Sequence, residues 1–301
     1  MHRSPSSRFR PFVLAAAFAL VAAPLYAQSA SPAQPARAID TLDLFIGLDG
    51  SKQPQDLGIN ANMGARFSGN FGVPIAKKAG LGAQFGVALN LSDAAVHVLD
   101  QVEGTSSRQQ TYLTFGVFQR ANGKINWGVA YDLLFEHYYD SFTLGQFRGQ
   151  AGYKVTSRDE VGAWVAVRTH GDDGVMGTTA VRLDPITQGN GYYERTWSSF
   201  ARTRIWAGVA SGHDNVVWVF PANTRSSPVF VYGADLHMPL NDRFAVTGAA
   251  NFLTPTATGT VDAYLGIVFY PGHIAMHHAA QDFSPLQAVA NNPTFSVNLK
   301  R

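Results

Sequence analysis

Residues 81–90 read LGAQFGVALN, in which every second side chain is apolar. Successive side chains of a β-strand point to opposite faces, so Phe85 and Val87 share one face of an extended segment. Gln84 and Asn90 lie on the other face. The alternation predicts a strand with one apolar face and one small or polar face.

The same alternation recurs along the chain, and no stretch after residue 40 shows a convincing helical period. The clearest further segments are 59–68, 111–120, 125–134, 200–209, 243–252 and 260–270. With an initial strand at 41–49, the count reaches about 12 strands. Residues 185–197 are needed for this even number, although Gly189 and Gly191 interrupt their alternation.

The composition of the second face distinguishes a soluble β-sheet protein from a transmembrane β-barrel. A soluble antiparallel sheet turns its polar face to water. Here that face carries Gly, Ala, Asn, Gln and Tyr, with arginines at intervals, which suits a crowded barrel interior. The continuous apolar faces suit lipid, and about ten residues is the length that a tilted transmembrane strand needs. The sequence therefore predicts an all-β fold, a closed antiparallel transmembrane β-barrel of about 12 strands.

Short and generally longer connections alternate between the predicted strands. The short links are at 77–78, 121–124, 157–159, near 198 and at 241–242, and the longer ones at 92–107, 138–141, 170–184, 211–227 and 254–258. Outer-membrane barrels have short periplasmic turns and longer external loops. Both ends of the predicted barrel, residues 41–270, are therefore expected on the periplasmic side.

Residues 1–27 have the pattern of a helical signal peptide: three arginines, an apolar core and a small-residue cleavage site after Ala27. A Ser/Ala/Pro-rich linker is expected at 28–40, and a periplasmic C-terminal tail at 271–301. Removing residues 1–27 takes three arginines from 23 Lys and Arg, which leaves 20 against 21 Asp and Glu, a net charge of about −1. This balance gives no argument for nucleic-acid binding.

The chain has no Cys, so it forms no disulfide and carries no lipobox. It also contains no Walker loop, dinucleotide fingerprint, HExxH or GxSxG sequence. We therefore expect no cofactor and, as the leading interpretation, no enzymatic activity.

Arginines on the predicted inward face are the leading candidates for function. The expected pore-lining residues are Arg66, Arg120, Arg148, Arg168, Arg202, Arg204 and Asp132. Charged rings of this kind set pore selectivity, and arginines favour small anions. The alternative is that the arginines pair inside the lumen with Asp43, Asp132, Glu194 or Asp235, since unpaired buried charge is costly and a 12-strand barrel is narrow.

Acidic and His residues near the predicted external rim suggest a rim-active hydrolase as an alternative function. They are Asp132, His137, Asp140, His170, Asp172, Asp173, His213 and Asp214. A His beside a carboxylate can act as a general base. His273, His277 and His278 have a spacing that can bind Zn²⁺ on a helix, but no acidic or Cys partner is close in sequence, so no metal is expected.

Four stretches resemble an uncharacterised family of predicted bacterial outer-membrane β-barrel proteins. They are YLTFGVFQR (112–120), WGVAYDLLFEHYYDSFTLGQFRGQAGY (127–153), GADLHMPLNDRFAVTGAANFLTP (233–255) and TGTVDAYLGIVFYPG (258–272). The resemblance implies the fold and no functional site.

The leading interpretation is a non-enzymatic protein of the cell outer membrane, either a narrow pore or a structural surface protein. Its expected partners are outer-membrane lipid, the barrel-insertion machinery and small solutes, with no nucleic acid. Gly266 to Phe269 partly fit the aromatic ending that the insertion machinery recognises. A soluble exported β-sandwich that binds partners through its loops remains a further alternative.

Overall fold

The computed structural model describes residues 38–57, 61–94, 107–120, 124–215, 224–226, 229–254, 260–278 and 281–301. Its elements are α2 (Ala38–Thr41), β1 (Asp43–Lys52), η1 (Pro54–Asp56), β2 (Asn62–Ala76), η2 (Lys77–Ala79), β3 (Leu81–Ala94), β4 (Arg108–Arg120), β5 (Ile125–His137), β6 (Ser141–Lys154), β7 (Asp159–His170), β8 (Asp172–Met176), β9 (Thr179–Pro185), β10 (Gln188–Thr196), β11 (Arg202–Ala210), β12 (His213–Asn215), β13 (Thr224–Ser226), β14 (Val229–Pro239), β15 (Phe244–Thr254), β16 (Thr260–Phe269), η4 (Asn292–Thr294) and β17 (Val297–Lys300). The predicted signal peptide and most of the predicted linker lie outside the described residues.

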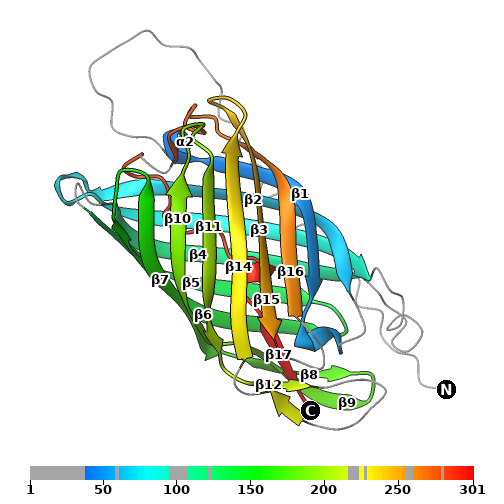
Figure 1. Ribbon diagram of the computed structural model, residues 1–301. Helices are drawn as coiled ribbons and strands as arrows, with labels where there is room; N and C mark the ends of the chain where they lie inside the picture. Colours follow the sequence, from blue (N-terminus) through cyan, green and yellow to red (C-terminus); the bar gives the residue numbers. More distant parts are fainter. Residues whose placement is uncertain are drawn as a thin grey trace. The chain divides into compact units, whose positions relative to one another are not determined.

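Twelve of the described strands close into one antiparallel barrel (Figure 1). The order is β1-β16-β15-β14-β11-β10-β7-β6-β5-β4-β3-β2, and β1 also pairs with β2. The first and last barrel strands meet along their length, with Leu44 opposite Phe269. The predicted closed barrel and its strand count are confirmed. β10 falls within the interrupted stretch 185–197 and pairs with both β7 and β11.

The two faces of each barrel strand point as the alternation predicts. Gln84 and Asn90 of β3 are each 1% exposed and face the lumen, whereas Phe85 and Val87 are exposed on the outside. The exposed outer residues of the other barrel strands are also largely Val, Leu, Ile and Phe. Such a continuous apolar exterior on a closed barrel is the surface that lipid covers. None of the described helices is long and apolar enough to cross a membrane.

The two ends of the barrel differ. At the turn end, which holds Asp43 and Phe269, the connections are short. At the loop end, the predicted loop at 170–184 folds into the hairpin β8–β9, and β12 pairs with β13. Because β8 and β9 leave the barrel wall, β7 pairs directly with β10. That the turn end faces the periplasm stays a prediction.

The chain after β16 does not form the tail outside the barrel that the sequence predicts. Residues 271–278 lie at the turn end, where the amide of Ala275 donates to the carbonyl of Asp242 (2.9 Å). Residues 281–301, the C-terminal segment, then run through the lumen, and β17 pairs with β9 at the loop end (Figure 1). The prediction of a tail outside the barrel is therefore wrong for this segment. Strand alternation is confined to its end, where Phe295, Val297 and Leu299 alternate with polar residues; residues 284–291 show none.

α2 precedes β1 at the turn end and is bonded to the barrel wall. The Thr41 hydroxyl donates to the carbonyl of Gly72 (2.7 Å), and the amide of Gly72 donates back to it (3.0 Å). The last residues of the predicted linker thus form a short helix that is held to the wall at β2.

A charge on the outward face is expected to destabilise the barrel according to its depth. Leu265, in the middle of β16, is 58% exposed, and Val155, beyond the turn-end edge of β6, is 53% exposed. Leu265→Arg should lower the free energy of unfolding by about 2–4 kcal/mol and Val155→Arg by about 0–1 kcal/mol. Urea unfolding of the protein in lipid vesicles measures both. Equal effects would show that lipid does not cover the apolar face.

Candidate functional site

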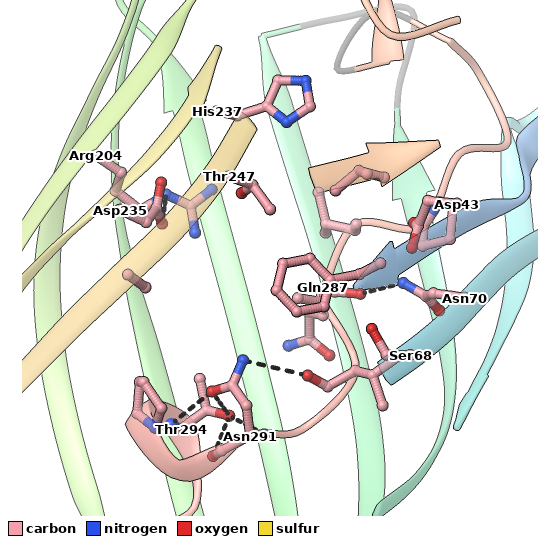
Figure 2. A pocket seen from close by; sticks show the side chains of 18 of the residues that line it. Asp43, Ser68, Asn70, Arg204, Asp235, His237, Thr247, Gln287, Asn291 and Thr294 are labelled. Atoms are coloured by element: carbon pink, nitrogen blue, oxygen red, sulfur yellow. Dashed lines mark hydrogen bonds and ion pairs between the residues drawn. The ribbon is translucent and has the colours of Figure 1, made fainter. Parts of the chain in front are cut away.

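The lumen contains a polar space beside the C-terminal segment (Figure 2). A cavity of about 190 Å³ is lined by barrel residues and by residues 285–294 of the segment. A second cavity of about 240 Å³ extends to the turn-end loop at 156–159. Arg120, Arg202 and Arg204 line both cavities, so the two cavities adjoin and together form the polar space between the turn end and the middle of the barrel.

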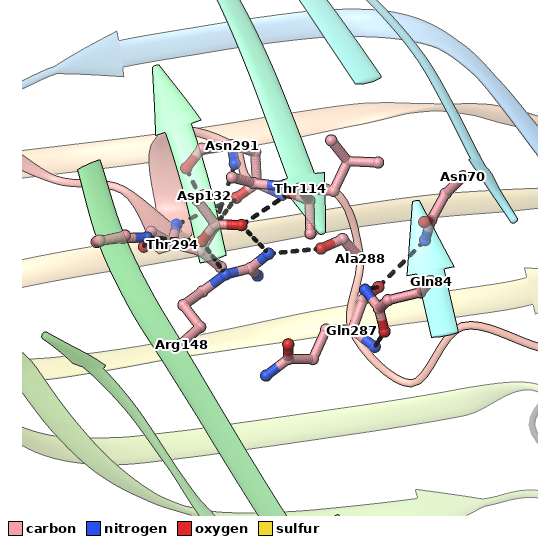
Figure 3. A network of polar contacts seen from close by, with 12 residues as sticks. Asn70, Gln84, Thr114, Asp132, Arg148, Gln287, Ala288, Asn291 and Thr294 are labelled. Carbon is pink, nitrogen blue, oxygen red and sulfur yellow. Dashed lines mark hydrogen bonds and ion pairs between the residues drawn. The ribbon is translucent and has the colours of Figure 1, made fainter. Parts of the chain in front are cut away.

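One of the predicted arginines forms a buried ion pair in the middle of the lumen (Figure 3). Arg148 on β6 donates to both carboxylate oxygens of Asp132 on β5. Asp132 is fully buried and also accepts from the hydroxyl of Thr114 (2.8 Å) and the side chain of Gln146 (3.1 Å). Four donors therefore offset the cost of burying this carboxylate, and this part of the internal pairing alternative is confirmed.

A second charged group lies near the turn end. Arg204 donates to Glu194 at 2.6 Å, and its guanidinium lies 4.6 Å from the centre of the Tyr192 ring. Arg202 lies 3.9 Å from the same carboxylate, and Asp235 lies 3.9 Å from Arg204. Figure 2 shows Asp235 beside Arg204 at the cavity wall. Two arginines thus share two carboxylates here.

Two further predicted arginines bind the chain inside the barrel. Arg66 donates to the carbonyl of Ala290 (3.1 Å) and to the side chain of Asn90 (2.9 Å). Arg120 donates to the carbonyls of Ser284 (2.9 Å) and Pro285 (2.7 Å). In these contacts the guanidinium groups meet neutral oxygens. The alternation of the strands predicts that these arginines face the lumen, but it does not predict their partners.

The predicted site residues therefore separate into three groups. The cavity is lined by Arg66, Arg120, Arg148, Arg202 and Arg204. Asp132 lies behind Arg148, as its ion-pair partner. Arg168 is not in this group, because its side chain is 47% exposed near the loop end of β7, where it pairs with Asp184 (2.9 Å).

Asp184 joins the end of the C-terminal segment to the loop end. Lys300 donates to this carboxylate at 2.6 Å, and Arg182 lies 3.3 Å from it. Burial alone raises the pKa of Asp184, but the hydrogen bond from Lys300 and the charges of Arg168 and Arg182 outweigh it and hold the pKa below its ordinary value. The ionised carboxylate therefore stabilises the attachment of β17 to β9.

The residues considered for a rim hydrolase have other contacts. Asp132 lies inside the lumen, and Asp140 and Asp172 accept from the backbone amides of Val175 and Thr143, both at 2.8 Å. His213 is buried beside the Asp214 carbonyl, and burial lowers the pKa of His213. These carboxylates stabilise loops in the part of the chain that the structure describes.

The three histidines after β16 contact different groups. His273 lies 3.0 Å from Asp242, His277 packs against Phe200, and His278 lies 4.0 Å from Asp43. Among the described residues, no group of three or more His, Cys, Asp and Glu is arranged to hold a metal ion.

Inward glycines make room for the C-terminal segment. A Cβ atom on Gly86 would lie 2.4 Å from a methyl carbon of Val289, and one on Gly72 would lie 2.0 Å from the carbonyl oxygen of Phe283. Both contacts are too short for a larger residue to be accepted without a shift. Glycine on the inward face was the available sequence signal, but it does not identify what approaches it.

One family model matches both the barrel strands and most of the C-terminal segment. A family of unknown function (DUF6666) matches residues 41–297. The chain belongs to this family. No curated protein matches the chain in sequence.

Solved structures show the same kind of barrel. The COG4313 outer membrane channel from Pseudomonas putida F1 has a TM-score of 0.55 and 9% identity, covering 80% of this chain and 99% of that one. A structure from work on the in-meso crystallization of membrane proteins has a TM-score of 0.50 and 10% identity, covering 85% of this chain and 100% of that one. This member of the DUF6666 family thus has the fold of outer-membrane β-barrels.

Removing the charge of Asp184 is expected to loosen β17. Since its pKa is depressed in the folded protein, its contribution is present above the ordinary carboxyl value and is lost as the pH falls through the lower folded value. Asp184→Asn should raise amide exchange at residues 297–300 by about tenfold at pH 7, because hydrogen bonds to charged groups contribute about 1.5–3 kcal/mol and the cations here are partly exposed.

Hydrogen-exchange mass spectrometry measures this effect in the vesicle-bound protein. Asp173→Asn is the matched control, because Asp173 is 75% exposed and pairs with Arg182 at the surface. Exchange at 297–300 that is the same in the two variants would contradict the role of Asp184.

Proposed function

We propose that this protein is a pore of the outer membrane, narrow and suited to small solutes, with a preference for anions. The lipid-facing exterior and the closed barrel support the location, and the polar space inside the barrel supports passage of solutes. The apolar-aromatic ending of β16 supports the insertion machinery as a partner.

The observation that carries the proposal is the balance of charge around the polar space. Its two cavities are lined by seven Arg and Lys residues and five Asp and Glu residues. The excess is positive, and charged side chains that line a pore set its ion preference. Arg202 and Arg204 line the cavity that extends to the turn end, which Lys154 and Arg158 also line.

The lumen is narrow because chain fills much of it. One apolar cluster contains Leu57, Tyr112 and Leu134 of the barrel side together with Phe295 and Leu299 of the C-terminal segment. A second contains Trp164, Trp206 and Leu253. These clusters occupy the part of the lumen toward the loop end, which favours small solutes and low conductance. A structural surface protein with the same fold is the alternative, and it predicts no conductance.

Planar-bilayer recordings of the full chain test the pore. We expect small conductance steps and a reversal potential in a KCl gradient that shows preference for Cl⁻. Arg202→Gln should reduce this preference about twofold or more, since Arg202 lines both cavities and its nearest carboxylate is 3.9 Å away. Lys78→Gln, at the exposed turn after β2, should leave it unchanged. An absence of conductance, or a preference for K⁺, would overturn the proposal.

A further inference from the structure

The C-terminal segment is held inside the barrel in two different ways. Its anchor, residues 292–300, is held by apolar burial and by strand pairing: Phe295, Val297 and Leu299 are each 0% exposed, and β17 pairs with β9. Complete burial of such side chains contributes about 1.5–3 kcal/mol each. The anchor is therefore firmly fixed at the loop end.

The strap, residues 284–291, is held by polar side chains of the barrel wall that donate to its backbone carbonyls (Figure 3). Its residues Val289 and Ala290 also belong to the apolar cluster that contains the anchor. The donors and acceptors are Arg120 to Ser284 and Pro285, Asn70 and Gln84 to Gln287, Arg148 to Ala288, and Arg66 to Ala290. The distances lie between 2.7 and 3.1 Å. The barrel wall thus presents a row of donors, and the strap supplies the oxygen atoms.

This arrangement of donors fits a stronger partner than the strap. Three of them are arginines, and the acceptors that the strap offers are neutral carbonyls; of the three, Arg148 also donates to the carboxylate of Asp132. A hydrogen bond between a guanidinium and an anionic oxygen is roughly twice as strong as one between neutral groups, and Arg binds carboxylate with two parallel bonds. A solute with several anionic oxygens therefore competes favourably for these side chains.

The polar space gives such a solute access to the donors. Pro285, Gln287 and Ala288 of the strap line the first cavity together with Arg66, Arg120 and Arg148. A solute that enters from the turn end lies against the strap and faces the same arginines. Exchange of strap oxygens for solute oxygens leaves every donor with a partner, so the exchange needs no unpaired buried charge.

We propose that the donors Arg66, Arg120, Arg148, Asn70 and Gln84 form a binding site for a small solute with several anionic oxygens. The strap is the internal occupant of this site, and the solute displaces it while the anchor stays in place. This inference rests on the proposed function, because it names the solute class that the pore admits and the part of the chain that moves when it enters.

Two buried serines allow a direct test in this Cys-free chain. Ser284 lies in the strap and Ser296 in the anchor, and they are 0% and 1% exposed. Ser284→Cys and Ser296→Cys are close in size to the native residues and form a matched pair. Maleimide labelling of each full-length variant in lipid vesicles is measured with citrate as the probe, and with NaCl at equal ionic strength and with glycerol as controls.

Citrate is expected to raise the labelling rate of Ser284→Cys at least tenfold and to leave Ser296→Cys unchanged, with no effect of NaCl or glycerol. Adding Arg66→Gln to Ser284→Cys should raise the citrate concentration needed, whereas adding Lys78→Gln should not. An unchanged rate at residue 284, an equal rise with NaCl, or an equal rise at both positions would overturn the site.

The conductance recordings separate this inference from the proposed function. If the protein shows no conductance but citrate still raises labelling at residue 284, the binding site is supported and the pore is overturned. If the protein conducts but citrate does not change labelling at residue 284, the pore is supported and the binding site is overturned.

Discussion

Pairing between β1 and β16 is the interaction on which the rest of the structure depends. Hydrocarbon offers no hydrogen-bond partner, so each backbone amide and carbonyl of a membrane-spanning strand must be paired with another strand. The ladder from Leu44 opposite Phe269 to Lys52 opposite Val261 supplies these partners for the first and last strands of the barrel. Without it, two edges would expose unpaired groups to lipid, at a cost of several kcal/mol for each group.

A barrel of twelve strands has an interior that wall side chains alone do not fill. Eight strands enclose a space that side chains just fill, whereas twelve strands enclose more. Here a segment of the same chain occupies part of that space, and inward glycines such as Gly72 and Gly86 let its backbone approach the wall. The remaining space is polar, and its arginines meet either carboxylates, as Arg148 meets Asp132, or carbonyls of the segment, as Arg66 meets Ala290.

The sequence predicts those features that depend on neighbouring residues. Alternation is local, so the strands, the direction of each face and the inward position of Arg66 and Arg120 could be predicted. β10 has poor alternation at Gly189 and Gly191, yet it pairs with β7 on one side and β11 on the other. Only the need for an even number of strands predicted a strand there. Arg168 was placed in the lumen because the regular period was extended to the end of β7. Arg168 keeps the register of the inward face, opposite Gln146, but it lies beside the loop end, where its side chain is 47% exposed and pairs with Asp184.

The partners of the inward arginines could not be predicted for a different reason. Ala290 is 224 residues from Arg66, and a backbone carbonyl carries no side-chain signature. Before β17 the segment also has no period, because its side chains meet wall and cavity in turn. The stretch 284–296 (SPLQAVANNPTFS) therefore has the composition of a loop, although most of it is buried.

The strap and the anchor differ in whether a solute or water can replace their contacts with the barrel. Apolar burial of Phe295 and Leu299 has no substitute in water or in a polar solute, so leaving the cluster costs the full transfer free energy. The hydrogen bonds of the strap can be exchanged for bonds to another acceptor at little net cost, because a typical bond contributes only about 0.5–1.5 kcal/mol once its replacement is counted. The chain is fixed by burial from Val289 onward and is held at residues 284–288 by exchangeable polar bonds. Release of residues 284–288 can therefore expose Arg120 and Arg148 of the wall while the barrel and its loop-end sheet stay intact.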